Sequence, residues 1–186
     1  GYRHMTNNVR PINTPDDMKG IKFRTTTSDL RLAVFEALGA QPVSMSFSEV
    51  YNALQLNTLD GQENPVDVPA TNNFYEVQKY ISATNHIADA WIVGMNTNKL
   101  NGLTENQQNA LHQAAEECQQ WYVDYQAEKD GEMLKLLTDN GMEYNEVPEE
   151  GFQEFVSVSQ ELYPKFKEMV QNDELFDATV AFCGKA

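Results

Sequence analysis

The sequence predicts an α/β fold, with a sheet covered by helices in its first half and a mainly helical second half. Two observations carry this prediction. In residues 1–98, short apolar runs of strand length alternate with segments of helical periodicity, which is the pattern of a sheet flanked by helices. From residue 99 onward, one helical pattern continues to about Asp139, and only a short strand and further helices follow it.

The elements of the first half are bounded by recognisable start and stop residues. Thr14-Pro15-Asp16-Asp17 begins a short helical turn, because Thr caps it, Pro fits its first position and acidic residues favour its first turn. Ser28 caps a helix that Gly39 ends, and Ser46-Phe47-Ser48-Glu49 has capping-box spacing. We also expect strands at residues 21–24, 42–45, 79–83 and 86–95, and one or two helical turns at residues 73–78. Asp60-Gly61 predicts a turn, and Asn64-Pro65 ends the element that precedes it.

One long helix dominates the prediction for the second half. Thr104-Glu105-Asn106-Gln107 is a capping box. A helix from there to about Asp139 would be roughly 50 Å long, which is more than one small lobe needs, so we expect it to cross between two lobes. We further expect a short strand at residues 143–147 and helices at residues 151–162, 166–170 and 173–182. An apolar stripe along the long helix is formed by Leu111, Ala115, Cys118, Tyr122 and Tyr125.

The charge of the chain argues against nucleic acid as a partner. The formal net charge is -15 at pH 7 and the sequence pI is about 4.4, so the surface repels phosphate backbones and anionic lipid. The longest apolar run, around residues 88–95, is much shorter than the roughly 20 residues that span a bilayer.

The sequence contains no arrangement typical of catalysis or metal binding. Its histidines are His4, His86 and His112, and no motif places a nucleophile beside a base. No group of His, Cys and Asp residues has ligand spacing, and the glycines occur singly rather than in a phosphate-binding loop. We therefore expect no catalytic residue, no metal site and no cofactor.

The arginines are unevenly distributed. All four lie in the first 31 residues, and every later cation is a lysine. Arginine presents a rigid fork of donors that suits a carboxylate. Arg24 ends the strand predicted at residues 21–24, and open α/β sheets bind ligands beyond the carboxyl ends of their strands. Arg24 is thus a candidate anion-binding residue, although surface ion pairs also explain a cluster of arginines.

Two polar segments accompany Arg24. The first is Asp60-Gly61-Gln62-Glu63-Asn64-Pro65, a dense polar run for which a surface loop is the alternative interpretation. The second is Thr84-Asn85-His86, where a single histidine at the start of a strand is more often structural than functional.

These segments and their neighbours resemble signature regions of a known family, the substrate-binding subunits of tripartite ATP-independent periplasmic (TRAP) transporters of the dicarboxylate and sialic-acid type. The resemblance is colinear from Gly1 to about Asn98 and continues more loosely to the carboxyl terminus. The regions that carry it are Gly20-Ile21-Lys22-Phe23-Arg24, Phe47-Ser48-Glu49-Val50-Tyr51-Asn52-Ala53-Leu54-Gln55, Asp60-Gly61-Gln62-Glu63-Asn64-Pro65, and Phe74-Tyr75-Glu76-Val77-Gln78-Lys79-Tyr80 with Thr84-Asn85-His86.

The resemblance implies a set of ligand-binding residues. Arg24 matches the arginine that forms a bidentate salt bridge with the substrate carboxylate in this family, and Asn64 matches an asparagine that also reaches the carboxylate. Arg3 matches an assisting arginine of the opening strand. Phe47 matches a phenylalanine that lines the pocket, and His86 matches a histidine of the ligand's polar or water network.

Two further expectations concern the same site. Members of the family often have Val-Pro after the strand arginine, whereas this chain has Thr25-Thr26-Thr27. We expect these hydroxyls to contact polar groups of the ligand, Thr27 in particular. Glu63, in the Gln-Glu-Asn-Pro motif, is also included among the candidate ligand-binding residues.

The resemblance also implies how the whole protein is built. Residues 1–98 would form a periplasmic-binding-protein-like lobe that clamps the ligand, and residues 99–186 the long hinge-spanning helix, a short strand and carboxyl-terminal helices. The family's amino-terminal lobe is not part of this sequence, so the 186-residue chain is expected to bind ligand weakly or not at all. Cys118 and Cys183 form either one disulfide or two buried thiols, and an oxidising compartment slightly favours the disulfide.

The function implied is capture of a small organic carboxylate and its delivery to the membrane permease subunits of a TRAP transporter. The protein would be periplasmic or otherwise extracytoplasmic, either free or held by a lipid. Two alternatives remain open at this point. One is the ligand-sensing module of a signalling receptor, and the other is an enzyme lobe that uses Glu63 and His86.

Overall fold

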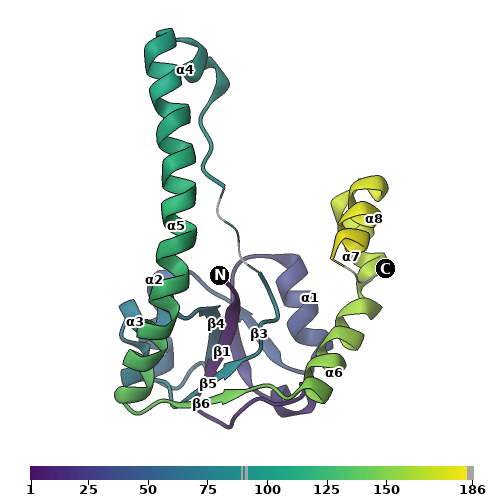
Figure 1. Cartoon of the computed structure of the whole chain (residues 1–186). Helices are drawn as coiled ribbons and strands as arrows, with labels where there is room; N and C mark the ends of the chain where they lie inside the picture. Colours follow the sequence, from purple (N-terminus) through teal and green to yellow (C-terminus); the bar gives the residue numbers. More distant parts are fainter. Residues whose placement is uncertain (89, 91, 184–186) are drawn as a thin grey trace.

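The computed structural model describes residues 1–88, 90 and 92–183, and within them six strands form one mixed sheet (Figure 1). The strand order is β3-β2-β4-β1-β5-β6. β2 is parallel to β3 and β4, and β5 is parallel to β6, whereas β1 is antiparallel to β4 and β5. The strands are β1 (Arg3–Asn7), β2 (Lys22–Thr25), β3 (Gln41–Ser44), β4 (Gly61–Pro65), β5 (Tyr80–Ala83) and β6 (Glu143–Glu146).

This topology brings several chain segments together along one edge of the sheet, the edge formed by the ends of its strands. β2, β3, β4 and β5 run in the same direction and end at that edge, and β1 begins there because it is antiparallel to its neighbours. Arg24, Asn64 and Arg3 therefore lie near one another although they are far apart in sequence. This is the edge at which open α/β sheets bind ligands.

Helices cover the sheet and extend from it (Figure 1). In the first half they are η1 (Pro15–Met18), α1 (Asp29–Ala37), α2 (Phe47–Gln55), α3 (Asp67–Thr71) and η2 (Phe74–Glu76). In the second half they are α4 (Thr97–Asn101), α5 (Glu105–Asp139), α6 (Glu149–Glu161), α7 (Tyr163–Val170) and α8 (Asp173–Phe182).

The helices pack on the sheet through three apolar clusters. One cluster joins Met5 and Phe23 of the sheet to Phe35 of α1 and Phe155 of α6. A second lies beneath α2 and η2, and a third joins β5 to α3 and the end of α5, where Leu137 is fully buried. The α/β fold with a mixed sheet and flanking helices, predicted from the sequence, is confirmed.

Most helix starts follow the residues that predicted them. Ser28 caps α1 through its side chain, which accepts a hydrogen bond from the backbone N–H of Arg31. The capping box of Thr104 and Gln107 is present and opens α5, which runs for 35 residues to Asp139. These starts depend on contacts within four residues, so the local sequence is sufficient to predict them.

The turn expected at Asp60-Gly61 and the alternative interpretation of residues 60–65 as a surface loop were wrong, whereas the element does end at Asn64-Pro65. Residues Gly61–Pro65 form β4, a central strand between β1 and β2 that is largely buried. Gln62 and Glu63 are both fully buried. A polar strand is stable in this position because its side chains form hydrogen bonds with groups from other strands, and these long-range partners are not apparent from the local sequence.

The strand predicted at residues 86–95 is also not formed as such. Its described residues contribute only an isolated bridge between Ala88 and Tyr2, and Trp91 lies outside the described residues. Ile92 and Val93 are 95% and 97% exposed. Their apolar side chains produced the strand prediction, but they cover no sheet in this structure.

Helix α5 extends well beyond the sheet (Figure 1). Its predicted apolar stripe is exposed in this structure, for example at Leu111 and Tyr122. Cys118 and Cys183 are free, exposed thiols, so the disulfide is not formed and the thiols are not buried. Among the described helices, none is both long and apolar enough to cross a membrane.

Candidate functional site

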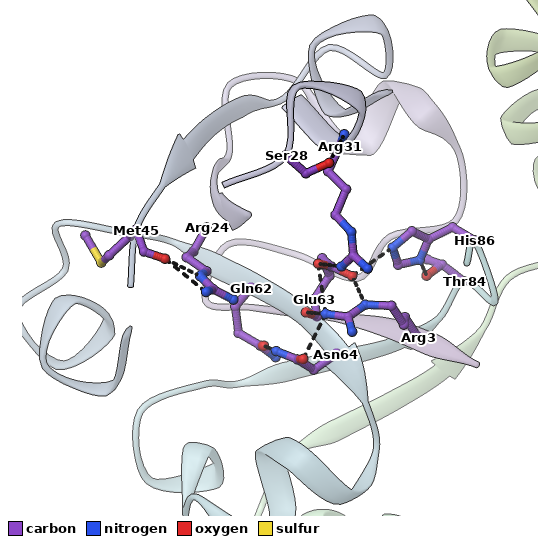
Figure 2. Close-up of polar contacts among 10 residues, drawn as sticks. All are labelled: Arg3, Arg24, Ser28, Arg31, Met45, Gln62, Glu63, Asn64, Thr84 and His86. Atoms are coloured by element: carbon purple, nitrogen blue, oxygen red, sulfur yellow. Dashed lines mark hydrogen bonds and ion pairs between the residues drawn. The ribbon is translucent and has the colours of Figure 1, made fainter. Parts of the chain in front are cut away.

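Most of the predicted site residues lie near the edge where β2, β3 and β4 end, and Figure 2 shows Arg3, Arg24, Glu63, Asn64 and His86 there. Arg24 comes from β2, Asn64 from β4 and Arg3 from the start of β1, while His86 follows β5. Phe47 is the first residue of α2, directly after β3. The parallel pairing of β2 with β3 and β4 therefore positions side chains from separate parts of the sequence at one place.

Arg24 is a buried cation that has no anionic partner among the described residues. It is only 4% exposed, and its Nε and Nη2 donate to the backbone oxygen of Met45 at 3.1 and 2.9 Å. Its guanidinium lies 5.7 Å from the ring centroid of Phe47. No carboxylate among the described residues is within ion-pair distance of Arg24, and its Nη1 forms no hydrogen bond to them. Burial lowers the pKa of Arg24, which reflects the unfavourable environment for its charge.

Glu63 has the opposite environment. It is fully buried, and Arg3 donates to its carboxylate from Nε and, at 3.0 Å, from Nη2. Nη1 of Arg31 lies 3.0 Å from Oε1, and Nε2 of His86 lies 3.4 Å from Oε2. Burial opposes ionisation of this carboxyl most strongly, but the neighbouring His86 and the hydrogen-bonded Arg3 outweigh it and lower the pKa of Glu63 to about 2. Glu63 is therefore ionised and serves as the buried counterion of Arg3 and Arg31.

Asn64 links these two environments. Its Oδ1 accepts a hydrogen bond from Nη2 of Arg3 at 2.8 Å, and its Nδ2 donates to Oε1 of Gln62 at 2.5 Å. Gln62 is the register partner of Arg24 across β4 and β2. The amide of Asn64 thus lies between the Arg3–Glu63 cluster and the strand that carries Arg24.

The remaining candidate ligand-binding residues differ in how far their side chains are exposed to solvent. Phe47 is 40% exposed beside Arg24, and Thr27 is exposed in the loop before α1. Thr25 is fully buried and its hydroxyl has no partner, so it does not present that hydroxyl to a ligand in this arrangement. Glu63 is likewise sealed from solvent, which gives it an indirect role through the arginines that it holds.

Sequence reasoning missed several members of the site. Arg31 had been noted only as one of the clustered arginines, and that clustering was its signal. Gln62 and Thr84, whose hydroxyl lies 2.7 Å from Nδ1 of His86, had no assigned role. His4 was also unassigned; its Nδ1 is buried without a partner and burial lowers its pKa.

Two other features of the structure bear on the chemistry. No group of three or more His, Cys, Asp or Glu side chains suited to a metal ion occurs among the described residues. A hollow lined in part by Asn8, Tyr51, Glu76 and Lys79 lies where β1 ends and so at the opposite edge of the sheet from Arg24. Arg24 is not among the residues that line this hollow.

Comparison with known proteins gives consistent results. The family model described as bacterial extracellular solute-binding protein, family 7, matches residues 1–169. The 2,3-diketo-L-gulonate-binding periplasmic protein YiaO of Escherichia coli (strain K12) is 37% identical over 143 residues, which are 77% of this chain and 44% of that protein. The sialic acid-binding periplasmic protein SiaP of Vibrio cholerae is 33% identical over 166 residues, covering 89% of this chain and 50% of that protein. The chain thus spans about half the length of these relatives.

Solved structures agree with the sequence relatives. A TRAP periplasmic solute-binding protein of Shewanella oneidensis with bound succinate has a TM-score of 0.89 and 32% identity, over 97% of this chain and 59% of that one. A TRAP periplasmic solute-binding protein of Sulfitobacter with bound β-D-galacturonate has a TM-score of 0.88 and 29% identity, over 97% of this chain and 58% of that one. The resemblance to TRAP substrate-binding subunits is confirmed, and the chain belongs to family 7 of the bacterial extracellular solute-binding proteins.

Proposed function

We propose that this chain is the carboxylate-binding part of a periplasmic solute-binding protein that captures a small organic acid for a TRAP membrane permease. The observation that carries the proposal is Arg24, a buried guanidinium without a carboxylate partner among the described residues. Relatives named for binding a keto sugar acid and sialic acid, and structures holding succinate and galacturonate, support a carboxylate as the ligand.

The geometry around Arg24 explains why it would select a carboxylate. The Met45 oxygen and the Phe47 ring fix the plane of the guanidinium, so little side-chain freedom remains to be lost on binding. A fixed guanidinium presents paired N–H donors that match the two oxygens of a carboxylate. The ligand's negative charge would also compensate a cation that the fold leaves without a counterion.

Glu63 supports this arrangement by engaging the neighbouring arginines. Because Arg3 and Arg31 contact Glu63 directly, their charges are already balanced in part by a carboxylate of the protein. Arg24 is then the cation with the most to gain from an incoming anion. We infer that Arg24 makes the primary contact, and that Asn64, Arg3, Phe47, Thr27 and His86 contribute secondary contacts.

A binding role is favoured over catalysis. The enzyme alternative would use Glu63 and His86, but Glu63 is sealed from solvent and its pKa is lowered to about 2. A group with this pKa is a poor general base near neutral pH, where catalysis requires a pKa close to the working value. Members of the matched family are solute-binding proteins, so we assign the chain no catalytic residue.

The thermal stabilisation of the chain by organic acids tests this proposal. We expect millimolar succinate, D-galacturonate or L-galactonate to raise the melting temperature, because a ligand that binds only the folded state stabilises it by mass action. Arg24→Lys should lose most of that gain, since Lys cannot form the paired contact and affinity should fall about tenfold or more.

Arg10→Lys provides the matched control. Arg10 also donates to backbone oxygens, those of Asp17 and Lys19, but it lies on the loop after β1, at the opposite edge of the sheet. Its variant should keep the gain in melting temperature. An unchanged gain in Arg24→Lys, or a gain lost equally in Arg10→Lys, would contradict the proposal.

A further inference from the structure

A continuous series of side-chain hydrogen bonds runs from the proposed site to the opposite edge of the sheet. Arg3 donates to Asn64 at 2.8 Å, Asn64 donates to Gln62 at 2.5 Å, and Gln62 donates to Thr6 at 2.9 Å. The Thr6 hydroxyl in turn donates to Oε1 of Gln78 at 2.9 Å. All five residues are buried, and none is more than 8% exposed. They come from β1, β4 and the segment before β5, so the chain of hydrogen bonds spans three neighbouring segments.

The groups at the two ends of this series of hydrogen bonds fix which residue donates and which accepts at every link. Arginine has only donors, so Asn64 must turn its oxygen toward Arg3 and its NH2 group toward Gln62. At the other end, Nε2 of Gln78 donates to the backbone oxygens of Asp60 and Val77, at 3.3 and 3.1 Å, which can only accept. Gln78 must therefore turn its oxygen toward the Thr6 hydroxyl. Both ends therefore require donation in the direction from Arg3 to Gln78, and every hydrogen bond between them has this direction.

The consequence is a fixed orientation of the Asn64 amide. Its oxygen is committed to Arg3 and one N–H to Gln62, and the second N–H has no acceptor among the described residues. Amide groups often adopt either of two flipped orientations, but here a flip would place NH2 against the Arg3 guanidinium. The remaining N–H is a donor, and a donor is what a carboxylate or hydroxyl oxygen of a ligand requires.

We propose that Thr6, Gln62 and Gln78 are positioning residues, which hold the Asn64 amide so that its free N–H faces the ligand that Arg24 binds. This inference rests on the proposed carboxylate-binding function. Thr6 is the critical link because its single hydroxyl both accepts from Gln62 and donates to Gln78. Without it, the amide of Gln62 can flip, and its NH2 would then face the NH2 of Asn64, a contact between two donors.

The test compares Thr6→Val with Thr6→Ser. Valine has nearly the shape of threonine but no hydroxyl, whereas serine retains the hydroxyl and loses only a methyl group. NMR of the 186-residue chain reports on the Asn64 side-chain NH2 resonances without ligand, and titration with succinate gives the affinity. We expect Thr6→Val to shift or broaden the Asn64 resonances and to weaken succinate binding roughly three- to tenfold, as expected for the loss of a buried hydrogen bond. Thr6→Ser should restore both properties.

The outcomes separate this inference from the proposed function. If Arg24→Lys responds to succinate as strongly as the unmodified chain, the proposed function is contradicted, whereas the ligand-free Asn64 resonances still test the orientation. Asn64 resonances and succinate affinity unchanged in Thr6→Val, or a Thr6→Ser variant that behaves like Thr6→Val, would overturn the positioning role. If Thr6→Val does not fold, Gln78→Met removes the hydrogen bond at the other end of the same series and should give the same change in the Asn64 resonances.

Discussion

Arg24 and Glu63 are two buried charges at the same edge of the sheet, and their surroundings differ sharply. Glu63 is contacted by Arg3 and Arg31, whereas Arg24 contacts a carbonyl oxygen and an aromatic ring and no carboxylate in the part of the chain that the structure describes. The two charges of a buried ion pair compensate each other. A buried cation without a counterion destabilises the folded protein until an anion binds to it. This difference between residues underlies the proposed binding site.

The pH dependence of stability should report the ionised state of Glu63. The pKa of its carboxyl falls from a reference value of 4.5 to about 2 in the folded chain. A carboxyl whose pKa is depressed by folding stabilises the protein above its unfolded pKa, and this stabilisation disappears as the pH falls through the folded pKa. We expect a loss of about 3 kcal/mol of unfolding free energy between roughly pH 4.5 and pH 2 from this group.

Glu63→Gln tests that expectation by urea unfolding at several pH values. The variant should be less stable than the unmodified chain at pH 7, because Arg3 and Arg31 lose their buried counterion. The difference between the two proteins should shrink as the pH falls below about 4.5. A difference that is constant from pH 7 to pH 2.5 would show that Glu63 is not the depressed carboxyl.

At the scale of elements, β4 determines whether the site forms. It lies between β1 and β2 and carries Gln62, Glu63 and Asn64. Gly61 permits its close approach to β1, because a Cβ at this position would meet the backbone oxygen of Thr6 and lie 2.8 Å from the Phe23 ring. The close contact explains the glycine at the start of a buried strand.

Gly61→Ala should therefore destabilise the chain by roughly 3 kcal/mol, as expected for overpacking against neighbouring backbone. Gly131→Ala is the matched control, since a Cβ there meets nothing within 4 Å. That substitution lies inside α5 and should stabilise the chain by up to about 1 kcal/mol through helix propensity. Urea unfolding of both variants measures these changes, and equal effects would contradict the packing argument.

The same elements show what the sequence could and could not predict. The Thr104 capping box and the Ser28 cap were read correctly because their partners lie within three residues. Arg24 was proposed as the anion-binding residue because a strand end and a clustered arginine are both visible in the sequence. The strand at Gly61–Pro65 was missed since its stability depends on hydrogen bonds to Arg3 and Thr6, about 60 residues away.

At the scale of the whole molecule, the chain combines a net charge of -15 with a local site for an anion. The site lies where β2 and β4 end, and Arg24 lines neither the hollow beside Asn8 and Tyr51 nor the one beside Pro15 and Glu150. An ion pair that remains in contact with water is weak, because the effective dielectric constant there is high.

We therefore expect the chain on its own to bind succinate with a dissociation constant of about 1 mM or weaker. Raising the salt concentration should weaken this binding further, since screening acts strongly on solvent-exposed ion pairs. An NMR titration at low and high salt measures both effects. Micromolar affinity in this chain would show that this edge of the sheet is enough to desolvate the ligand.

The central claim is that Arg24 holds the carboxylate, and the Nε–H resonances of the arginine side chains test it most directly. In a titration of the ¹⁵N-labelled chain with succinate, D-galacturonate and L-galactonate, we predict that the Arg24 resonance moves furthest and that the Arg10 resonance stays in place. If the acids shift other resonances while that of Arg24 does not move, the carboxylate binds elsewhere and the account is wrong.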